Sequence, residues 1–332
     1  MTTLITGGAG YIGSHMALAL LDRGERTVIL DNLSTGVRAL IPARAAFIEG
    51  DVGDADLLRW LIRRYGIDEV VHFAGSTVVP ESVAQPLAYY RNNAAAALTL
   101  LSVMEECGVE RLVFSSTAAV YAPSDRPVDE DAPLGPVTPY GASKLMVERM
   151  IRDAAAAGIL RAGVLRYFNV AGADAAGRAG QSTPRATHLI KAACEAACGR
   201  RAALTIHGDD WPTPDGTGVR DYIHVQDLIE IHALMLRRLR EGGATAVLNC
   251  GYGKGASVRE VIGAVERAAG RRVPVRIGPR RPGDLAQVVA RADRVRATLG
   301  WRPRNDDLDR IVGSALAWEA RAGPAPAPVS PS

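Results

Sequence analysis

The chain has little cysteine, and this shortage excludes the disulfide-rich class of small secreted proteins. Its 332 residues include only four cysteines, at positions 107, 194, 198 and 250. Thiols without a disulfide spacing are typical of a reducing compartment, so we expect a cytoplasmic protein. Cys194 and Cys198 lie four residues apart in a predicted helix, but no second pair of cysteines or histidines lies nearby to complete a zinc site. We therefore predict no metal.

Strong charge and long apolar runs are also missing. The formal net charge is +3, and arginines alternate with acids instead of forming a long basic run. We therefore expect no nucleic-acid partner. No stretch of about 18 apolar residues occurs, so no membrane span is predicted. The first residues carry no basic leader and their apolar run breaks at Gly7, so we expect no signal peptide.

What the chain does have is a glycine-rich turn between a strand and a helix. The segment TLIT predicts a short strand, Gly7, Gly10 and Gly13 follow at intervals of three, and the next apolar residues have helical spacing. Such a turn lets a phosphate approach bare backbone amides, and the helix N-terminus favours its negative charge. Asp31 ends the next strand, TVILD, where a carboxylate can accept from both ribose hydroxyls of an adenosine and would repel a 2′-phosphate. We predict a dinucleotide site for NAD in preference to NADP.

Further strands alternate with helices along the chain. One strand ends at Asp51 and Val52, a second at residues 73–75 and a third at residues 115–117. This order predicts an α/β fold with a doubly wound parallel sheet of the Rossmann type. Because ligands bind beyond the carboxyl ends of the strands in such sheets, these three stretches are expected on the cofactor side.

The segment TPYGASK places Tyr140 and Lys144 four residues apart on the first turns of a predicted helix. Residues with this spacing share one face, so both side chains can reach one spot. Only three of the 39 basic residues are lysines, so this chain uses arginine almost everywhere else. An ammonium near a phenol lowers the pKa of the phenol, which can then act as a general base. We predict that Tyr140 is that base and that Thr117 binds the same substrate hydroxyl.

With these residues in view, the chain resembles the UDP-glucose 4-epimerase family of extended short-chain dehydrogenases/reductases. The motifs run in family order over about the first 300 residues. They are TGGAGYIGSH, DNLSTG, GDVGD, VHFAG, PESVAQPLAYYRNN, FSSTAAVY, TPYGASK, RYFNVAGA, DGTGVRDYIHVQDL and RRPGDLAQVVA.

The resemblance implies an isomerase that interconverts UDP-glucose and UDP-galactose. Tyr140 takes the proton of the sugar 4-hydroxyl with help from Thr117, the C4 hydride passes to bound NAD, and the 4-keto sugar turns over and takes the hydride back. Lys144 tunes Tyr140 and contacts the cofactor. The cofactor-binding residues that the resemblance and the strand ends imply together are Gly7, Gly10, Tyr11, Ile12, Gly13, Asp31, Asn32, Asp51, Val52, Phe73, Ala74, Gly75, Asn93, Ser115, Lys144 and Tyr167.

The resemblance also implies a set of residues that hold the UDP sugar. They are Thr117, Tyr140, Asn169, Leu189, His207, Arg220, Arg281, Asp284 and Val288. Arginine forks suit a diphosphate, and a carboxylate suits ribose hydroxyls. The chain departs from the family at His207, where an aromatic residue often lies against uracil. Val288 leaves room around the sugar C2 substituent, so UDP-N-acetylhexosamines are a possible further substrate.

The sequence raises three alternative functions. A dehydratase needs an acid pair after the strand-end hydroxyl, but alanines follow Thr117. A 4-epimerase of another UDP sugar, a pentose or a hexuronate, stays open. So does a protein that binds NAD without catalysis, although such a protein has no need of the Tyr140, Lys144 and Thr117 set.

The expected organisation is two interleaved parts and a tail. Residues 1–168 are predicted to form the NAD-binding domain, with segments near 221–251 returning to it. Residues 169–320 form a smaller substrate-binding lobe, and residues 321–332, rich in proline, alanine and serine, form a disordered tail. The alanine-rich helices around 88–107 and 143–158 are expected to pair with a second copy in a homodimer, as the resemblance implies.

Overall fold

The computed structural model describes residues 1–183, 187–281 and 283–321, and the predicted tail lies outside these ranges except for Arg321. A seven-stranded sheet forms the centre of the larger lobe, in the order β10-β6-β5-β4-β1-β2-β3, with every neighbouring pair parallel. The predicted doubly wound parallel sheet is therefore confirmed. The strands are β1 (Thr2–Thr6), β2 (Arg26–Asp31), β3 (Ala46–Glu49), β4 (Glu69–His72), β5 (Arg111–Thr117), β6 (Arg161–Tyr167) and β10 (Ala246–Cys250).

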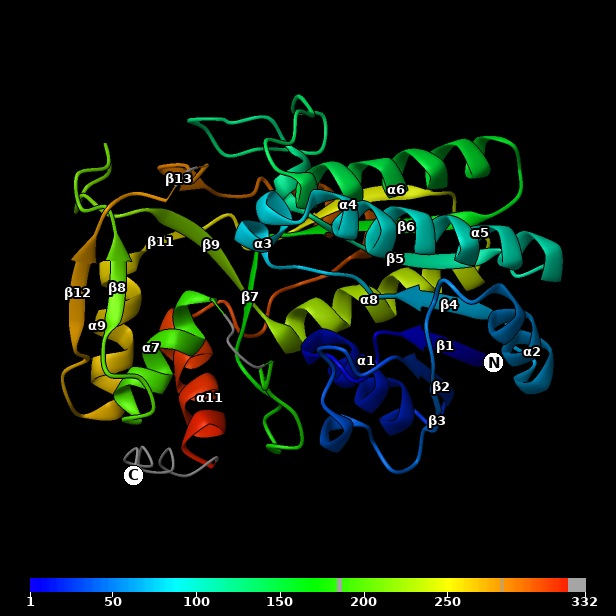
Figure 1. Cartoon of the computed structure of the whole chain (residues 1–332), viewed down its shortest axis with the longest axis horizontal. Helices are drawn as coiled ribbons and strands as arrows, with labels where there is room; N and C mark the ends of the chain where they lie inside the picture. The colour runs from blue at the N-terminus through cyan, green and yellow to red at the C-terminus, as the bar shows by residue number, and fades with distance from the viewer. Residues whose placement is uncertain (184–186, 282, 322–332) are drawn as a thin grey trace.

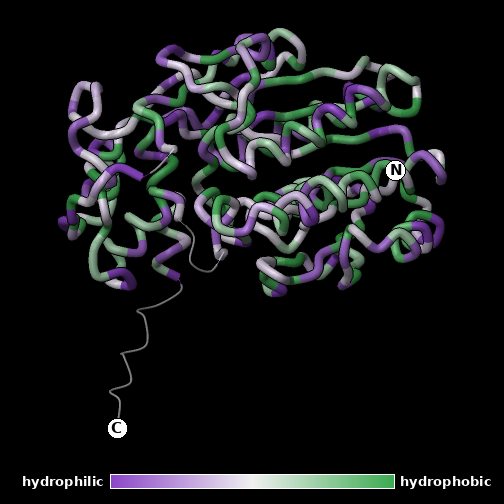
Figure 2. The backbone as a smooth tube through the Cα atoms, turned by 45° about the horizontal axis from the view of Figure 1, so that its top comes forward, coloured by the Kyte–Doolittle hydropathy of each residue, from purple (hydrophilic) through white to green (hydrophobic). Residues whose placement is uncertain are grey.

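Helices cover both faces of this sheet. Successive strand residues point to opposite sides, so Leu4 belongs to one apolar core and Ile5 to the other. The Ile5 side is covered by α1 and α8, and the Leu4 side by α2, α5 and α6. Figure 2 shows the apolar stretches running through the larger lobe. The helices are α1 (Tyr11–Asp22), α2 (Ala55–Tyr65), α5 (Ala96–Cys107), α6 (Pro139–Ala156) and α8 (Val225–Arg240).

The smaller lobe, at the left of Figure 1, is built around strand β9. This strand pairs with β7 and β13 in parallel and with β11 antiparallel, while β8 and β12 form a separate parallel pair. Helices α7, α9 and α11 pack together in this lobe. The elements are β7 (Asn169–Ala171), α7 (Leu189–Ala197), β8 (Leu204–His207), β9 (Val219–His224), β11 (Gly255–Ser257), α9 (Val258–Ala269), β12 (Val275–Gly278), β13 (Gln287–Val288), α10 (Asp293–Leu299) and α11 (Leu308–Arg321).

The chain passes more than once between the two lobes. Strand β9 joins the smaller sheet, whereas α8 packs against the larger one and β10 extends it beside β6. Three short elements connect β4 to α5 along the chain, and a fourth follows β5. They are α3 (Val79–Ala84), α4 (Pro86–Tyr89), the π-helix η2 (Tyr90–Ala95) and the 3₁₀ turn η3 (Ala118–Val120); a second 3₁₀ turn, η1 (Arg38–Leu40), follows β2. We keep the division at residues 168 and 169, with this interleaving, as a proposal.

Within the described residues, helices long and apolar enough to cross a bilayer are absent.

Candidate active site

The glycine turn joins β1 to α1 at the carboxyl edge of the larger sheet. Gly7 has φ +71°, and a Cβ there would lie 2.6 Å from the backbone nitrogen of Ala74. A Cβ on Gly13 would lie 2.2 Å from the Gly7 carbonyl oxygen. The turn therefore admits only glycine at these positions. Helix α1 begins after Gly10 without a side-chain cap, so its first amides face outward unpaired and fit a pyrophosphate.

Asp31 lies at the end of β2 beside this turn. Its Oδ2 accepts from the Ala9 amide at 2.9 Å, and its Oδ1 accepts from the Leu33 amide at 2.8 Å. The second bond accompanies a left-handed backbone at Leu33, where φ is 55°. Each carboxylate oxygen keeps a further lone pair for a ligand hydroxyl. The two protein contacts hold the carboxylate at the position where an adenosine ribose would lie.

The next acid along this edge, Asp51, follows β3. Its Oδ2 accepts from the Asn32 amide group at 2.8 Å, and its Oδ1 accepts from the Gly53 amide at 2.7 Å. Val52 beside it is buried. Asp51 thus lies at the same sheet end as Asp31, with its carboxylate held by Asn32 and Gly53.

Asn93 holds the loop that follows β4. It lies in the π-helix η2, a form that often marks functional sites, and is 3% exposed. Its Oδ1 accepts from the Ser76 amide at 2.7 Å, and its Nδ2 donates to the Ser143 hydroxyl at 3.0 Å. A Cβ on Gly75 would lie 3.0 Å from the same Oδ1. Asn93 therefore joins this loop to α6 with no room to spare.

Helix α6 begins at Pro139, so its first turn carries Tyr140, as the sequence predicts. The Thr138 hydroxyl caps the helix by accepting from the Gly141 amide at 3.3 Å. A Cβ on Gly141 would lie 2.2 Å from the Ala119 carbonyl oxygen. The absence of a side chain at Gly141 lets the helix approach the end of β5 closely, which brings Tyr140 beside Thr117.

One hydrogen bond fixes this corner, where α6 meets β5. The Lys144 ammonium donates to the Ser115 carbonyl at 3.0 Å and lies 5.0 Å from the centroid of the Phe114 ring. Thr117 lies close enough to the Tyr140 phenol to lower its pKa. The three predicted catalytic residues are thus gathered at one strand end.

The pKa values of the two ionisable groups differ from the sequence-based expectation. Burial raises the pKa of the Tyr140 phenol, and the nearby Thr117 side chain offsets part of that rise. The prediction that Lys144 lowers this pKa is wrong for the net direction, because burial of the phenol raises it. Burial lowers the pKa of Lys144 to about 8.

One further turn along α6, a buried ion pair ties the helix to the sheet. Glu148 and Arg166 are 0% and 1% exposed. The guanidinium forks onto the carboxylate at 2.9 and 2.6 Å, and the Ser116 hydroxyl donates to the same carboxylate at 2.5 Å. Arg166 also donates to the Tyr121 hydroxyl at 3.0 Å. Sequence reasoning missed Glu148, although its position four residues after Lys144 places it on the same helix face.

Tyr167, at the end of β6, completes the cofactor edge. It is 7% exposed, and its hydroxyl lies 3.1 Å from His232 Nε2. The His232 ring stands 5.0 Å from the Phe73 ring. Burial raises the pKa of Tyr167 and lowers that of His232 to about 4. These neutral rings form an apolar wall behind the residues 73–75 loop.

Four of the predicted substrate-binding residues gather in the smaller lobe. Burial lowers the pKa of the Arg220 guanidinium, Arg281 acts in the same direction, and Asp284 opposes them. Burial and Arg281 lower the pKa of His207. In the described part of the chain, neither arginine has a carboxylate within 4.0 Å. Two guanidinium groups that lack a carboxylate partner among the described residues, and that repel each other electrostatically, are suited to binding an anion.

The other predicted substrate-binding residues lie on neighbouring elements. Val288 of β13 is the register partner of Arg220 in β9. Asn169 of β7 donates to the Asp221 carbonyl at 3.3 Å, and Leu189 begins α7. Val288 and Asn169 therefore lie on the two strands that pair in parallel with β9, whereas Leu189 lies on a helix of the same lobe.

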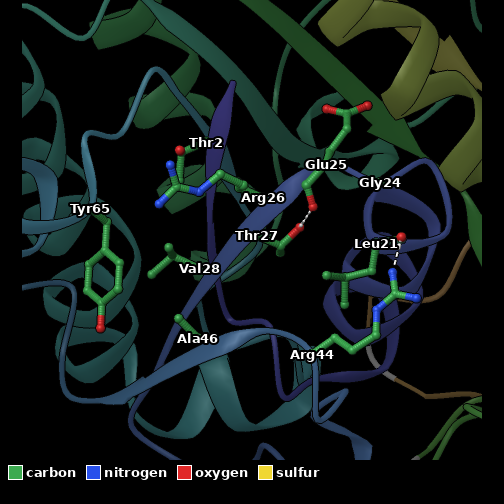
Figure 3. Close-up of a pocket in the computed structure, with 10 residues that line it drawn as sticks. All are labelled: Thr2, Leu21, Gly24, Glu25, Arg26, Thr27, Val28, Arg44, Ala46 and Tyr65. Atoms are coloured by element: carbon green, nitrogen blue, oxygen red, sulfur yellow. Dashed lines mark hydrogen bonds between the residues drawn. The ribbon is translucent and has the colours of Figure 1, made fainter.

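A hollow elsewhere on the surface contains none of the predicted residues. It lies at the amino ends of β1 and β2, and Thr2, Arg26, Arg44 and Tyr65 are among its lining residues (Figure 3). Arg44 donates to the Leu21 carbonyl there. Since parallel sheets bind ligands at their carboxyl ends, this hollow is not the candidate site.

The parallel sheet and the corner where α6 meets β5 define the class of protein. It is a Rossmann-type protein with a dinucleotide-type glycine turn and a Tyr–Lys pair at the same sheet edge. Residues 3–251 match the NAD dependent epimerase/dehydratase family. The chain is 59% identical to the UDP-glucose 4-epimerase of Azospirillum brasilense over 317 residues, covering 95% of this chain and 91% of that protein. The chain therefore belongs to the UDP-glucose 4-epimerase family within the NAD dependent epimerase/dehydratases.

Solved structures are similar over nearly the whole chain. The Bifidobacterium longum UDP-glucose 4-epimerase in complex with NAD⁺ and UDP has a TM-score of 0.91 at 38% identity and covers 97% of this chain and 98% of that one. The UDP-Glc/GlcNAc 4-epimerase of Campylobacter jejuni has a TM-score of 0.83 at 43% identity, with 96% and 99% covered.

Proposed function

We propose that the chain is an NAD-dependent UDP-glucose 4-epimerase, an isomerase that interconverts UDP-glucose and UDP-galactose. The observation that carries this conclusion is the corner where α6 meets β5. There Thr117 lies close enough to the Tyr140 phenol to lower its pKa, and Lys144 lies one helical turn further on. The glycine turn and Asp31 at the same sheet edge support NAD as the cofactor.

Tyr140 is proposed to hold and move the proton of the sugar 4-hydroxyl. Thr117 donates or accepts at the same oxygen and orients it, and Lys144, which is bonded to the end of β5, contacts the nicotinamide ribose. NAD⁺, when bound, supplies the reversible acceptor for the C4 hydride and a positive ring whose charge favours the phenolate. This charge acts against the burial that raises the pKa of Tyr140. The bound cofactor would therefore lower the pKa of the phenol toward the range in which a general base is most effective.

Inversion at C4 requires the sugar to turn while its nucleotide stays bound. Arg220 and Arg281 are proposed to grip the diphosphate, since neither has a carboxylate within 4.0 Å in the described residues. Asp284 accepts from the ribose hydroxyls, and His207 lies against the uracil. With the nucleotide end held, the 4-keto sugar rotates about the diphosphate linkage and presents its other face. Asn169 and Leu189 line the space in which it turns.

The test is turnover of UDP-galactose by the purified chain without added NAD. We expect UDP-glucose to form and the bound nucleotide to be recovered as NAD after denaturation. A protein that binds NAD without catalysis would release NAD but convert nothing. A panel that includes UDP-pentoses and UDP-hexuronates separates the main proposal from a 4-epimerase of another UDP sugar, which would turn over one of those sugars faster.

A second activity, on UDP-N-acetylhexosamines, is supported by Val288. This half-buried valine pairs with Arg220 beside the proposed diphosphate site and is smaller than an aromatic residue. The similarity to a UDP-Glc/GlcNAc 4-epimerase supports the same reading. We expect Val288→Tyr to lower kcat/KM for UDP-N-acetylgalactosamine at least tenfold and to change that for UDP-galactose less than threefold. Equal losses for both sugars would contradict this role.

A second copy of the chain is the proposed partner. Helices α5 and α6 lie side by side on the outside of the larger lobe (Figure 1), and Leu98 and Met146 on them are 53% and 48% exposed. Val83 and Leu87 on the adjoining helices are also exposed. Such a face is typical of helix-to-helix interfaces. Light scattering should give the mass of a dimer, and Leu98→Glu should give a monomer, whereas Trp60→Glu on α2 should not.

The cysteines support the cytoplasm as the compartment. All four are free, and Cys194 and Cys250 are buried. Proteins that keep thiols reduced belong to reducing compartments. Fractionation of cells that express the chain tests this assignment.

A further inference from the structure

Two loops of the smaller lobe leave the same edge of the β8–β12 pair. These strands are parallel, with Gly278 opposite His207, so both segments leave the strand pair at the same end. The Gly208 amide donates to the Gly278 carbonyl at 2.9 Å, just where the loops begin. The first loop follows His207, and the second carries Arg281 and Asp284. The proposed nucleotide site therefore depends on how these two loops lie relative to each other.

One side chain from each loop bridges them. The guanidinium carbon of Arg280 lies 4.1 Å from the centroid of the Trp211 ring. Its Nε donates to Asp210 Oδ1 at 2.8 Å, and a terminal nitrogen donates to the Asp210 carbonyl at 2.6 Å. Arg280 is thus held by a ring face, a carboxylate and a carbonyl, all of the other loop. Stacking and charge-assisted hydrogen bonds together are stronger than either contact alone.

The bridge is also tied to the residues that it would position. The Trp211 Nε1–H donates to the His207 carbonyl at 3.2 Å. Gly208 has φ +82°, and a Cβ there would lie 2.6 Å from Arg280 Cγ and 2.7 Å from Trp211 Nε1. The turn at Gly208 therefore has room for the bridge only because it carries no side chain. On the other loop, Arg281 follows Arg280 directly.

We infer that Trp211 and Arg280 form a clamp that positions the two nucleotide-binding loops and so sets the affinity for a uridine diphosphate. Trp211 fixes the backbone of His207, and Arg280 fixes the start of the segment that carries Arg281 and Asp284. The clamp is made of positioning residues, since the contacts described for it are with protein groups. It touches none of the groups at the corner where α6 meets β5. This inference rests on the proposed function for the identity of the ligand.

The predicted consequence is a change in binding without a change in chemistry. Arg280→Gln removes the stacking cation and its charged hydrogen bonds, and we expect the Kd for UDP and the KM for UDP-galactose to rise about three- to tenfold. The kcat and the NAD content should stay at the wild-type values. Trp211→Phe keeps a ring face but loses the donor to His207, and we expect a smaller rise. Calorimetric titration of the purified holoenzyme with UDP gives the Kd, and steady-state kinetics give KM and kcat. The nucleotide released on denaturation gives the NAD content.

A matched control removes an equivalent contact elsewhere. Arg64 lies 5.7 Å from the centroid of the Tyr65 ring on α2, so Arg64→Gln removes a cation and a stacked pair outside the smaller lobe. Its Kd for UDP should equal that of the wild type. If Arg280→Gln and Trp211→Phe both bind UDP within the error of the control, the clamp is refuted. A fall in kcat with an unchanged Kd for UDP would refute it equally.

The design separates this inference from the proposed function. UDP binding is measured without turnover. If the wild type binds UDP and the variants bind it more weakly, the clamp stands even when UDP-galactose is not converted, and the proposed function alone fails. If UDP-galactose is converted and the variants bind UDP like the control, only the clamp fails.

Discussion

The corner where α6 meets β5 and the loops of the smaller lobe are built in opposite ways. At the corner, Lys144, Glu148 and Arg166 are each 3% exposed or less, and their charged groups are hydrogen-bonded to the strand ends or to one another. In the smaller lobe, the side chain of Arg280 is 41% exposed, and the contacts run between loops. The corner is thus held by buried charged contacts at a strand end, whereas the two loops are held to each other by a partly exposed contact.

The difference has an energetic basis. A buried charge must be paired, and breaking such a pair is costly. An exposed cation and ring are screened by water, so each contact contributes little by itself. Substitutions at the corner should therefore have large effects on turnover or folding, and substitutions in the loops should have small effects on binding.

The largest expected effect is at Tyr140. Tyr140→Phe removes the proposed proton carrier, so kcat should fall by about 10²–10⁴, the usual range for loss of a general base. Bound NAD and the melting temperature should change little, because the ring remains. Tyr65→Phe, which removes a phenol from α2, is the control and should keep full activity. Full-speed epimerisation by Tyr140→Phe would overturn the proposed mechanism.

The next effect compares two glutamates that each bind an arginine. Glu148→Gln leaves Arg166 buried without its counter-charge and should lower the free energy of unfolding by about 3–5 kcal/mol. Glu106→Gln breaks the pair with Arg59, in which the two side chains are 48% and 34% exposed, and should lower the free energy of unfolding far less than Glu148→Gln does. Urea denaturation measures both. Equal losses would mean that burial does not distinguish the two pairs.

A smaller effect is expected at Arg220 in the smaller lobe. Arg220→Gln removes one fork from the proposed diphosphate site, and the Kd for UDP should rise about 10- to 100-fold, as for loss of a charged hydrogen bond. Arg276→Gln carries the same change of charge on the exposed strand β12 and serves as the control. If both variants bind UDP equally, Arg220 acts only through the overall field of the lobe.

The smallest expected effect is the pH dependence that Lys144 introduces. Its pKa is lowered to about 8 in the folded chain from 10.5, so between these two values the unfolded chain holds a proton that the folded chain has released. The free energy of unfolding should therefore rise with pH from about 8 to about 10.5, by on the order of 1–3 kcal/mol. Lys144→Met should remove this rise, and Lys254→Met, at an exposed lysine paired with Asp306, should not. A rise that persists in Lys144→Met would assign it to another group.

The same contrast describes how far sequence reasoning reaches. The parallel sheet, the glycine turn and the start of α6 at Pro139 follow from local patterns, because a tight turn, a cap and an apolar period are set by neighbouring residues. The direction of the Tyr140 pKa could not be predicted from spacing. The spacing of four residues places Tyr140 and Lys144 on one helix face, but it does not determine which acceptor the ammonium binds.

Contacts between distant segments were beyond prediction for the same reason. Asn93 joins a loop to α6 through Ser76 and Ser143, and Arg280 reaches Asp210 across 70 residues of sequence. No local period encodes such pairs. They exist only once the strands have set the loops side by side.

The sequence by itself determined which chemistry this chain carries: a strand and helix around bare glycines, an acid at the end of β2, and a tyrosine and lysine on one helical turn. These are local properties of backbone and spacing. Only the tertiary structure decided that Lys144 turns to the Ser115 carbonyl, that Glu148 and Arg166 lock α6 to the sheet, and that Trp211 and Arg280 join two loops. Those outcomes depend on burial and on the approach of segments far apart in the chain, and both arise only when the whole chain packs.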